Sequence, residues 1–175
     1  MEGEEKELEA YIRSIPDYPK KGIVFKDITP MLADAAAFKR CIDEVSKKAA
    51  ALKPDYIVGI DARGFIIGSA VAYSLGIGFI PARKKGKLPY KAISEEYTLE
   101  YGKASLEMHE DSFAKGSRTV IIDDLLATGG TADAAGKLVT RLGGFVEGYI
   151  FVIEISELAG RALLGEEKVI SIMKF

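Results

Sequence analysis

The chain has 175 residues, of which 48% are hydrophobic and 29% are charged, with a formal net charge of −2. This length and composition suffice for one domain with a full hydrophobic core. The near balance of charges disfavours nucleic-acid binding through general basicity. No run approaches the roughly 20 apolar residues of a membrane-spanning helix. We therefore expect a single domain, residues 1–175, with neither nucleic acid nor membrane as a partner.

Location and metal chemistry follow from a few residue types. The acidic start, residues 1–6, lacks the cationic and apolar regions of a secretory signal peptide. Cys41 is the only cysteine and cannot form an internal disulfide, so we expect a cytoplasmic location. No His/Cys cluster is present, so any metal should be a hard ion such as Mg²⁺. His109, the only histidine, is expected at the surface without a catalytic role.

The hydrophobic periodicity predicts an α/β fold. Apolar spacing predicts a helix over 4–15, ended by two prolines. Residues 22–30 are typical of an edge strand leading into a helix, and 34–52 of a long amphipathic helix. Strands and helices then alternate, with strands expected at 56–60, 78–82, 104–108, 120–122, 145–155 and 168–172 and helices at 65–73 and 132–139. This alternation predicts a mainly parallel central sheet flanked by helices on both faces.

The most informative stretch joins the apolar run 120–122 to an acidic pair and a glycine-rich turn. Asp123 and Asp124 follow the run, and a helical pattern begins after the turn. Unpaired N–H groups at a helix N-terminus bind anions. Two glycines permit close backbone approach, and two threonines add hydroxyl donors. The turn consists of Ala127, Thr128, Gly129, Gly130 and Thr131.

The adjacent carboxylates need a separate explanation, because each raises the cost of ionising the other. Sugar hydroxyls, water or a metal ion would relieve that cost. A phosphorylated sugar therefore fits both parts, with its phosphate in the turn and its hydroxyls on the acids. The alternative is a capped helix with no ligand, since lone glycine motifs are weak evidence.

Two further segments place charge at strand ends. Asp61 and Arg63 follow the strand 56–60, at the edge where open α/β sheets bind ligands. Arg63 could instead simply pair with Asp61. Residues 83–91 hold five cations, a glycine and a proline, typical of a solvated loop. Such a loop can close on a polyanion. The alternation over 95–103 predicts a returning hairpin arm.

Several of these motifs resemble a known family. Residues 120–131 resemble the 5-phosphoribosyl-1-diphosphate (PRPP) site of type I phosphoribosyltransferases. Residues 22–30, with Gly-Ile-Val-Phe-Lys-Asp-Ile-Thr-Pro, and 99–102, with Leu-Glu-Tyr-Gly, resemble the adenine phosphoribosyltransferases within that family. The resemblance spans about residues 15–172. It implies a small N-terminal hood over 1–30 that contacts the base, a flexible β-hairpin catalytic loop over 83–107, and a homodimer.

The resemblance also implies a reaction, in which adenine and PRPP give AMP and diphosphate with Mg²⁺ as cofactor. PRPP-binding residues would be Asp123, Asp124, Ala127, Thr128, Gly129, Gly130 and Thr131. Adenine-binding residues would be Val24, Phe25, Lys26 and Leu125. Catalytic residues would be Glu100, Arg63, Lys87 and Tyr101. No residue would bind the metal directly, because Mg²⁺ would arrive with PRPP close to the two aspartates.

Two alternatives stay open at this stage. One is a regulator on the same fold that senses PRPP or a purine nucleotide. The other is a phosphoribosyltransferase for another purine base, such as xanthine. Enzymes for 6-oxopurines commonly carry Asp at the position of Ala127, so the alanine favours an aminopurine. Many adenine enzymes have Glu at the position of Asp61, which is a conservative departure.

Overall fold

The computed structural model describes residues 8–99 and 102–175 and divides the chain into two compact units, Met1–Glu44 and Val45–Phe175. The predicted catalytic residues Glu100 and Tyr101 lie outside the described residues. Within the described residues, no helix is both long and apolar enough to cross a membrane.

The first unit contains a β-hairpin followed by helices. Strands β1 (Arg13–Pro16) and β2 (Val24–Asp27) pair antiparallel, and α2 (Thr29–Ala33) follows them. Helix α3 (Ala35–Ala51) runs across the boundary into the second unit. The Asp34 carboxylate accepts the N–H groups of the second and third residues of α3 at 3.0 and 2.9 Å, and so caps the helix. The strand at 22–30 and the amphipathic helix at 34–52 are thereby confirmed.

The predicted helix over 4–15 is wrong at its C-terminal end. Residues 8 and 9 are helical, but a turn follows and Arg13–Pro16 form β1. Ile15 pairs with Phe25 across the hairpin, so its backbone is engaged by β2 instead of a helical turn. Apolar positions at helical spacing could not reveal this partner, because the pairing is with a segment outside the periodic window.

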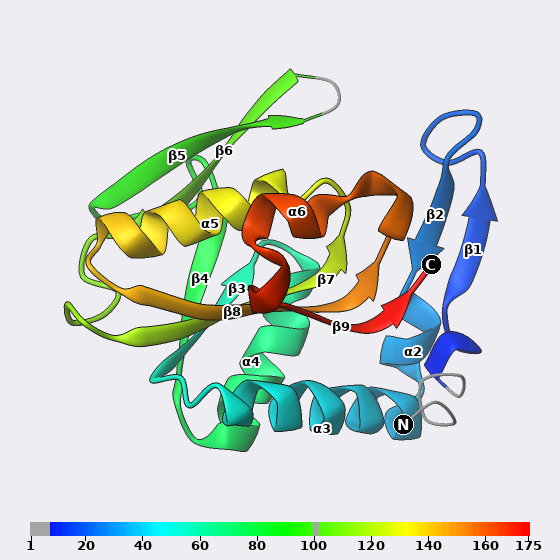
Figure 1. Cartoon of the computed structure of the whole chain (residues 1–175), viewed down its shortest axis with the longest axis horizontal. Coiled ribbons are helices and arrows are strands. Elements are labelled where there is room, and N and C mark those ends of the chain that lie inside the picture. The colour runs from blue at the N-terminus through cyan, green and yellow to red at the C-terminus, as the bar shows by residue number, and fades with distance from the viewer. Residues whose placement is uncertain (1–7, 100–101) are drawn as a thin grey trace. The chain divides into compact units, whose positions relative to one another are not determined.

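The described residues of the second unit form a seven-stranded sheet in the order β5-β6-β4-β3-β7-β8-β9 (Figure 1). Strands β4, β3, β7, β8 and β9 run parallel to one another, while β6 is antiparallel to β4 and β5 is antiparallel to β6. This confirms the predicted, mainly parallel sheet. Its strands are β3 (Tyr56–Ile60), β4 (Gly78–Lys84), β5 (Ala92–Leu99), β6 (Gly102–His109), β7 (Arg118–Leu126), β8 (Phe145–Glu154) and β9 (Val169–Lys174).

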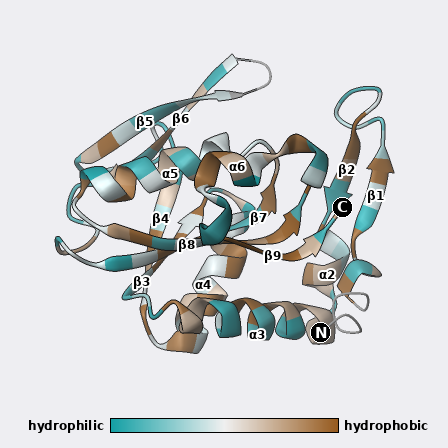
Figure 2. Cartoon of the chain, in the orientation of Figure 1, coloured by the Kyte–Doolittle hydropathy of each residue, from teal (hydrophilic) through white to brown (hydrophobic). Residues whose placement is uncertain are grey.

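Helices cover both faces of this sheet. Helix α4 (Arg63–Leu75) packs on β3, β4 and β7, and α5 (Gly130–Arg141) packs on β7 and β8 from the opposite face (Figure 1). The central residues of β7, 120–122, are fully buried, as expected for a strand covered on two sides. Figure 2 shows hydrophobic colour in the central strands and hydrophilic patches along α5.

The topology brings several loops to one edge of the sheet. Strands β3 and β7 are parallel and adjacent, with Val58 opposite Ile121, so their carboxyl ends lie side by side. The end of β3 leads into α4, and the end of β7 leads through the glycine-rich turn into α5. The end of β8 leads into a short 3₁₀ segment (Ser156–Leu158), α6 (Gly160–Leu164), and a second 3₁₀ segment (Glu166–Lys168) before β9. Ligands of open α/β sheets bind at this edge.

Candidate active site

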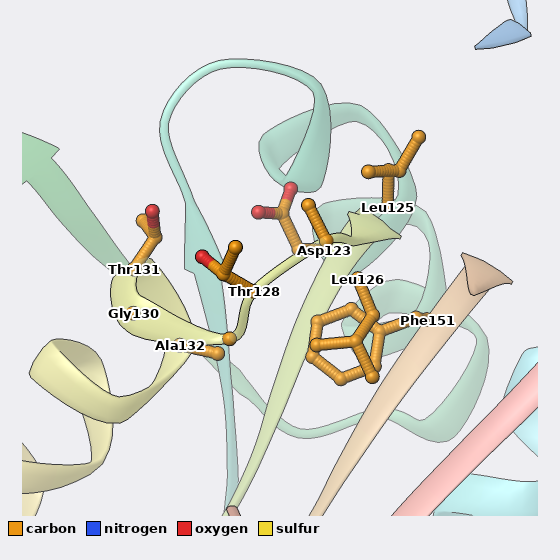
Figure 3. Close-up of a pocket in the computed structure, with 10 residues that line it drawn as sticks. Asp123, Leu125, Leu126, Thr128, Gly130, Thr131, Ala132 and Phe151 are labelled. Atoms are coloured by element: carbon orange, nitrogen blue, oxygen red, sulfur yellow. The ribbon is translucent and has the colours of Figure 1, made fainter. Parts of the chain in front are cut away.

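A cavity of about 340 Å³ lies at the carboxyl end of β7 (Figure 3). Figure 3 shows Thr128, Thr131 and the Asp123 carboxylate on one side of the turn, with Leu126 and Phe151 packed together on the other. Every residue of the predicted phosphate turn lines the cavity. Its lining is Asp123, Leu125, Leu126, Ala127, Thr128, Gly129, Gly130, Thr131, Ala132 and Phe151.

The turn has the backbone shape that an anion site needs. Gly129 precedes α5 with φ +85° and ψ −9°, a left-handed conformation that favours glycine. Among the described residues, no side chain caps the first turn of α5. The N–H groups of that turn therefore remain donors for a ligand, supported by the positive end of the helix dipole.

The acidic pair lies beside this turn and is linked to α4. Asp124 is buried, and the Nε of Arg63 donates a hydrogen bond to its Oδ2. Oδ1 of Asp123 accepts the N–H of Asp124 at 2.9 Å. Burial, and then the neighbouring Asp124 charge, raise the pKa of Asp123 well above its ordinary value of 3.8, while Arg63 opposes the rise. The sequence offered Asp61 as a partner for Arg63; in the structure Arg63 donates to Asp124, and the Asp61 carboxylate lies close to Arg83.

A glycine allows α4 to approach the acidic strand end. A Cβ built on Gly64 would lie 2.7 Å from the carbonyl oxygen of Ile122 and 2.9 Å from Oδ1 of Asp123. Such distances exclude a side chain without movement of the strand. Gly64 therefore permits the close packing that brings its neighbour, Arg63, to the acidic pair.

The cationic segment begins at the same edge. The Nε of Arg83 lies 3.6 Å from Oδ2 of Asp61, and its guanidinium lies 5.9 Å from the centre of the Phe65 ring. An Nη of Arg83 donates to the carbonyl of Lys87 at 3.1 Å, and the N–H of Gly86 donates to a Glu107 carboxylate oxygen at 2.9 Å. The side chain of Lys87 is exposed. The backbone of the segment is thus anchored close to the strand ends.

The predicted hairpin arm is present as β5 and β6 and lies against α5. A Cβ built on Gly130 would be 3.3 Å from the carbonyl oxygen of Thr98, near the end of β5. Farther along the arm, Glu95 pairs with Arg141 at 2.9 Å. The arm therefore reaches the N-terminus of α5, whereas Glu100 lies outside the described residues.

The proposed adenine contacts lie on different elements. Val24, Phe25 and Lys26 form part of β2 in the first unit. The Phe25 ring meets Tyr18 edge-on, with centroids 5.4 Å apart, and Nζ of Lys26 donates to Oγ of Ser14 at 3.0 Å. Leu125, by contrast, lines the cavity in the second unit.

The sequence pattern did not indicate Gly160, whose backbone packs directly against the phosphate turn. A Cβ built on Gly160 would lie 2.2 Å from the carbonyl oxygen of Ala127 and 2.9 Å from the nitrogen of Gly129. The backbone of α6 is therefore in direct contact with the phosphate turn. The only signal in the sequence was a glycine in a short connection, which by itself indicates a turn.

The expectation for His109 also needs correction. Its ring is partly buried, edge-on to Tyr90 at 6.0 Å between centroids. Its Nε2 is inaccessible and has no hydrogen-bond partner within the described chain. Packing at the base of the hairpin explains this position, which the sequence pattern alone did not indicate.

The carboxylates of Asp123 and Asp124 fit a magnesium ion that is carried by a ligand. Within the residues the structure describes, no group of three or more His, Cys, Asp or Glu side chains could hold a metal alone. Asp123 and Asp124 offer hard carboxylate oxygens, which Mg²⁺ prefers. Because Arg63 already engages Asp124, most of the ion's ligands would have to be substrate oxygens.

Comparison with known proteins agrees with this geometry. Residues 26–147 match the family described as "Phosphoribosyl transferase domain". An adenine phosphoribosyltransferase from Brachyspira hyodysenteriae is 60% identical over 155 residues, covering 89% of this chain and 91% of the relative.

Solved structures extend the similarity over nearly the whole chain. A crystal structure of adenine phosphoribosyltransferase from Thermoanaerobacter pseudethanolicus has a TM-score of 0.94 and 52% identity, covering 98% of this chain and 99% of that one. The Saccharomyces cerevisiae enzyme, complexed with D-2,5-dideoxy-2,5-imino-altritol 1,6-bisphosphate and adenine, has a TM-score of 0.92 and 36% identity, covering 98% and 99%. The strand-end acidic pair, the glycine turn and these similarities together assign the chain to the type I phosphoribosyltransferases, and within them to the adenine phosphoribosyltransferase family.

Proposed function

We propose that this chain is a purine-salvage enzyme that transfers the 5-phosphoribosyl group from PRPP to adenine, giving AMP and diphosphate. The observation that carries the proposal is the cavity formed by the turn 127–131 and the acidic pair. The names of its close relatives support it, as does the yeast relative crystallised with adenine and a sugar-like bisphosphate.

In this proposal the turn binds the 5′-phosphate and the acids bind the ribose. Backbone N–H groups at the start of α5 and the hydroxyls of Thr128 and Thr131 donate to phosphate oxygens. Asp123 and Asp124 accept hydrogen bonds from ribose hydroxyls. Displacement at the anomeric carbon passes through an oxocarbenium-like state, as in other glycosyl transfers, and nearby carboxylates favour its positive charge.

The cations act on the departing diphosphate. Arg63 lies beside the acidic pair, and Lys87 extends from the loop that begins at the same edge. Together with Tyr101 they stabilise the charge that leaves with diphosphate. When bound, Mg²⁺ carried by PRPP near Asp123 and Asp124 adds charge stabilisation on the phosphate oxygens.

The proposed contacts with adenine are those that the family resemblance implies. They are Val24, Phe25 and Lys26, in residues 1–30, and Leu125, beside the turn. Glu100 hydrogen-bonds the purine or exchanges a proton with it. The loop 83–107 closes on the substrates and excludes water that would hydrolyse PRPP. We further propose that residues 1–175 act as one phosphoribosyltransferase domain, in a cytoplasmic homodimer.

A base-consumption assay tests this function. The chain is incubated with PRPP and Mg²⁺, and the absorbance change is followed separately with adenine, hypoxanthine, guanine and xanthine. We expect rapid consumption of adenine, with AMP and diphosphate formed in equal amounts. Preference for another base would assign a different purine enzyme. Binding of PRPP without turnover of any base would favour the nucleotide-sensing regulator.

A further inference from the structure

The phosphate turn rests on the backbone of α6. A Cβ on Gly160 would meet the carbonyl oxygen of Ala127 at 2.2 Å, and a Cβ on Gly129 would meet the carbonyl oxygen of Gly160 at 2.7 Å. The two backbones are therefore packed without space for a methyl group between them. Any displacement of Gly160 must move the turn, because nothing in this contact can yield except the backbone itself.

The next residue, Arg161, fixes where α6 lies. Its Nε and one Nη donate to the two carboxylate oxygens of Glu154 at 3.0 and 2.6 Å. Its other Nη donates to the carbonyl of Val169 at 2.7 Å and to that of Glu166 at 3.2 Å. The Arg161 guanidinium thus joins α6 to the end of β8, to the start of β9 and to the 3₁₀ segment Glu166–Lys168.

This cluster is well shielded from water. The side chains of Arg161 and Glu154 are 22% and 8% exposed, and the hydroxyl of Ser171 donates to the same Glu154 carboxylate. The hydrogen bond from Arg161, followed by that from Ser171, lowers the pKa of Glu154. A planar fork on a carboxylate is a geometrically demanding contact that lysine cannot reproduce.

We propose that Arg161 and Glu154 are positioning residues for phosphoribosyl binding: they hold α6 so that Gly160 sets the shape of the phosphate turn. The inference rests on the proposed function, since it assumes that the turn binds the 5′-phosphate. Neither side chain lines the cavity, so both act through the Gly160 backbone. Their loss should weaken binding of the phosphorylated sugar much more than binding of the base.

The chain supplies a control ion pair between β7 and β8, at the opposite ends of these strands. Arg118 donates through Nε to Glu147 at 3.0 Å and through an Nη to the carbonyl of Leu52 at 2.7 Å. This pair also links β7, β8 and a loop, but at the amino ends of the strands, opposite the cavity. Replacing Arg118 perturbs a more exposed ion pair, with side chains 41% and 31% exposed, without touching α6.

The experiment compares Arg161→Lys and Glu154→Gln with Arg118→Lys and the wild type. For each protein we measure kcat, KM for PRPP, KM for adenine, the thermal midpoint, and the Kd for ribose 5-phosphate by calorimetry. The first two variants should raise KM for PRPP and Kd for ribose 5-phosphate about tenfold or more, because misplacing binding groups by an ångström is costly. KM for adenine should change less than about twofold. Arg118→Lys should change only the thermal midpoint.

Equal changes in the two KM values, or a lowered thermal midpoint with unchanged ribose 5-phosphate affinity, would overturn the positioning role. If neither cluster variant folds, Ser171→Ala decides the question, because it removes only one hydrogen bond to Glu154. It should weaken ribose 5-phosphate binding by about threefold, and an unchanged Kd would overturn the role. A wild type that neither binds ribose 5-phosphate nor consumes PRPP would contradict the proposed function as well.

Discussion

The guanidinium of Arg63, at the start of α4, donates through Nε to the carboxylate of Asp124 at the end of β7, 61 positions along the chain. The contact joins the cation proposed for the diphosphate to an acid proposed for the ribose. Asp124 is buried, whereas the Arg63 side chain is 44% exposed. Charge compensation of the acidic pair and presentation of Arg63 at the sheet edge are therefore two results of one interaction.

Replacing Asp124 by Asn should remove activity but not the fold. Asparagine keeps the size of the side chain and an oxygen that accepts from Arg63, and it relieves repulsion with Asp123. We expect kcat/KM for PRPP to fall by about 10²-fold or more, since a charge near the developing cation is lost. Steady-state kinetics beside a thermal melt checks this, and near-normal kcat/KM would remove the ribose role.

The raised pKa of Asp123 predicts a specific pH dependence of stability. Folding favours the protonated carboxyl, so its contribution is fully present below 3.8 and is lost as pH rises through the higher folded-state pKa. Thermal midpoints of wild type and Asp123→Asn, measured without ligand, should therefore diverge in favour of the variant as pH rises above 3.8. Carboxylates away from the acidic pair contribute equally to both proteins, and Asp123→Asn removes the repulsion with Asp124 as well. Parallel profiles would show that burial does not perturb Asp123.

Gly129→Ala should damage both the turn and phosphate binding. The left-handed conformation costs a non-glycine residue about 1–2 kcal/mol, and the new Cβ would meet the carbonyl oxygen of Gly160. KM for PRPP should rise about tenfold. Gly136→Ala is the control on the same helix, because its Cβ would meet the Tyr149 hydroxyl away from the turn. The control should lose stability only; similar KM changes in both variants would contradict the assignment.

Glu100→Ala tests the proposed contact with the base. If the carboxylate exchanges a proton with the purine, kcat should fall by about 10²-fold or more. Glu96→Ala serves as its control, because Glu96 lies on the same hairpin arm and pairs with Lys103 at 2.6 Å. That exposed pair should contribute little. A change in kcat below about threefold for Glu100→Ala would limit the residue to a binding contact.

Features encoded by short-range patterns could be predicted from the sequence. Local periodicity and turn chemistry predict the buried run 120–122, the glycine turn and the amphipathic helix at 34–52. The same holds for the hairpin arm predicted from the alternation over 95–103. These elements were enough to predict that Asp123 and the turn lie at one edge of a parallel sheet.

Features that depend on distant partners could not be predicted this way. The sequence offered only Asp61 as a carboxylate partner for Arg63, whereas its hydrogen bond to Asp124 depends on the packing of Gly64 against β7. The residues of β1 were predicted as helix because their apolar spacing is helical and gives no sign of the pairing with β2. The sequence placed Gly160 in an ordinary connection. Its contact with the turn depends on the pairing of β7 with β8, which brings the two loops together.

A crystal structure of the chain with PRPP or ribose 5-phosphate, together with Mg²⁺, tests the central claim most directly. We expect the 5′-phosphate in the turn 127–131, with its oxygens accepting the N–H groups at the start of α5, and ribose hydroxyls on Asp123 and Asp124. A phosphate bound elsewhere, with the turn closed by its own side chains, would contradict the account.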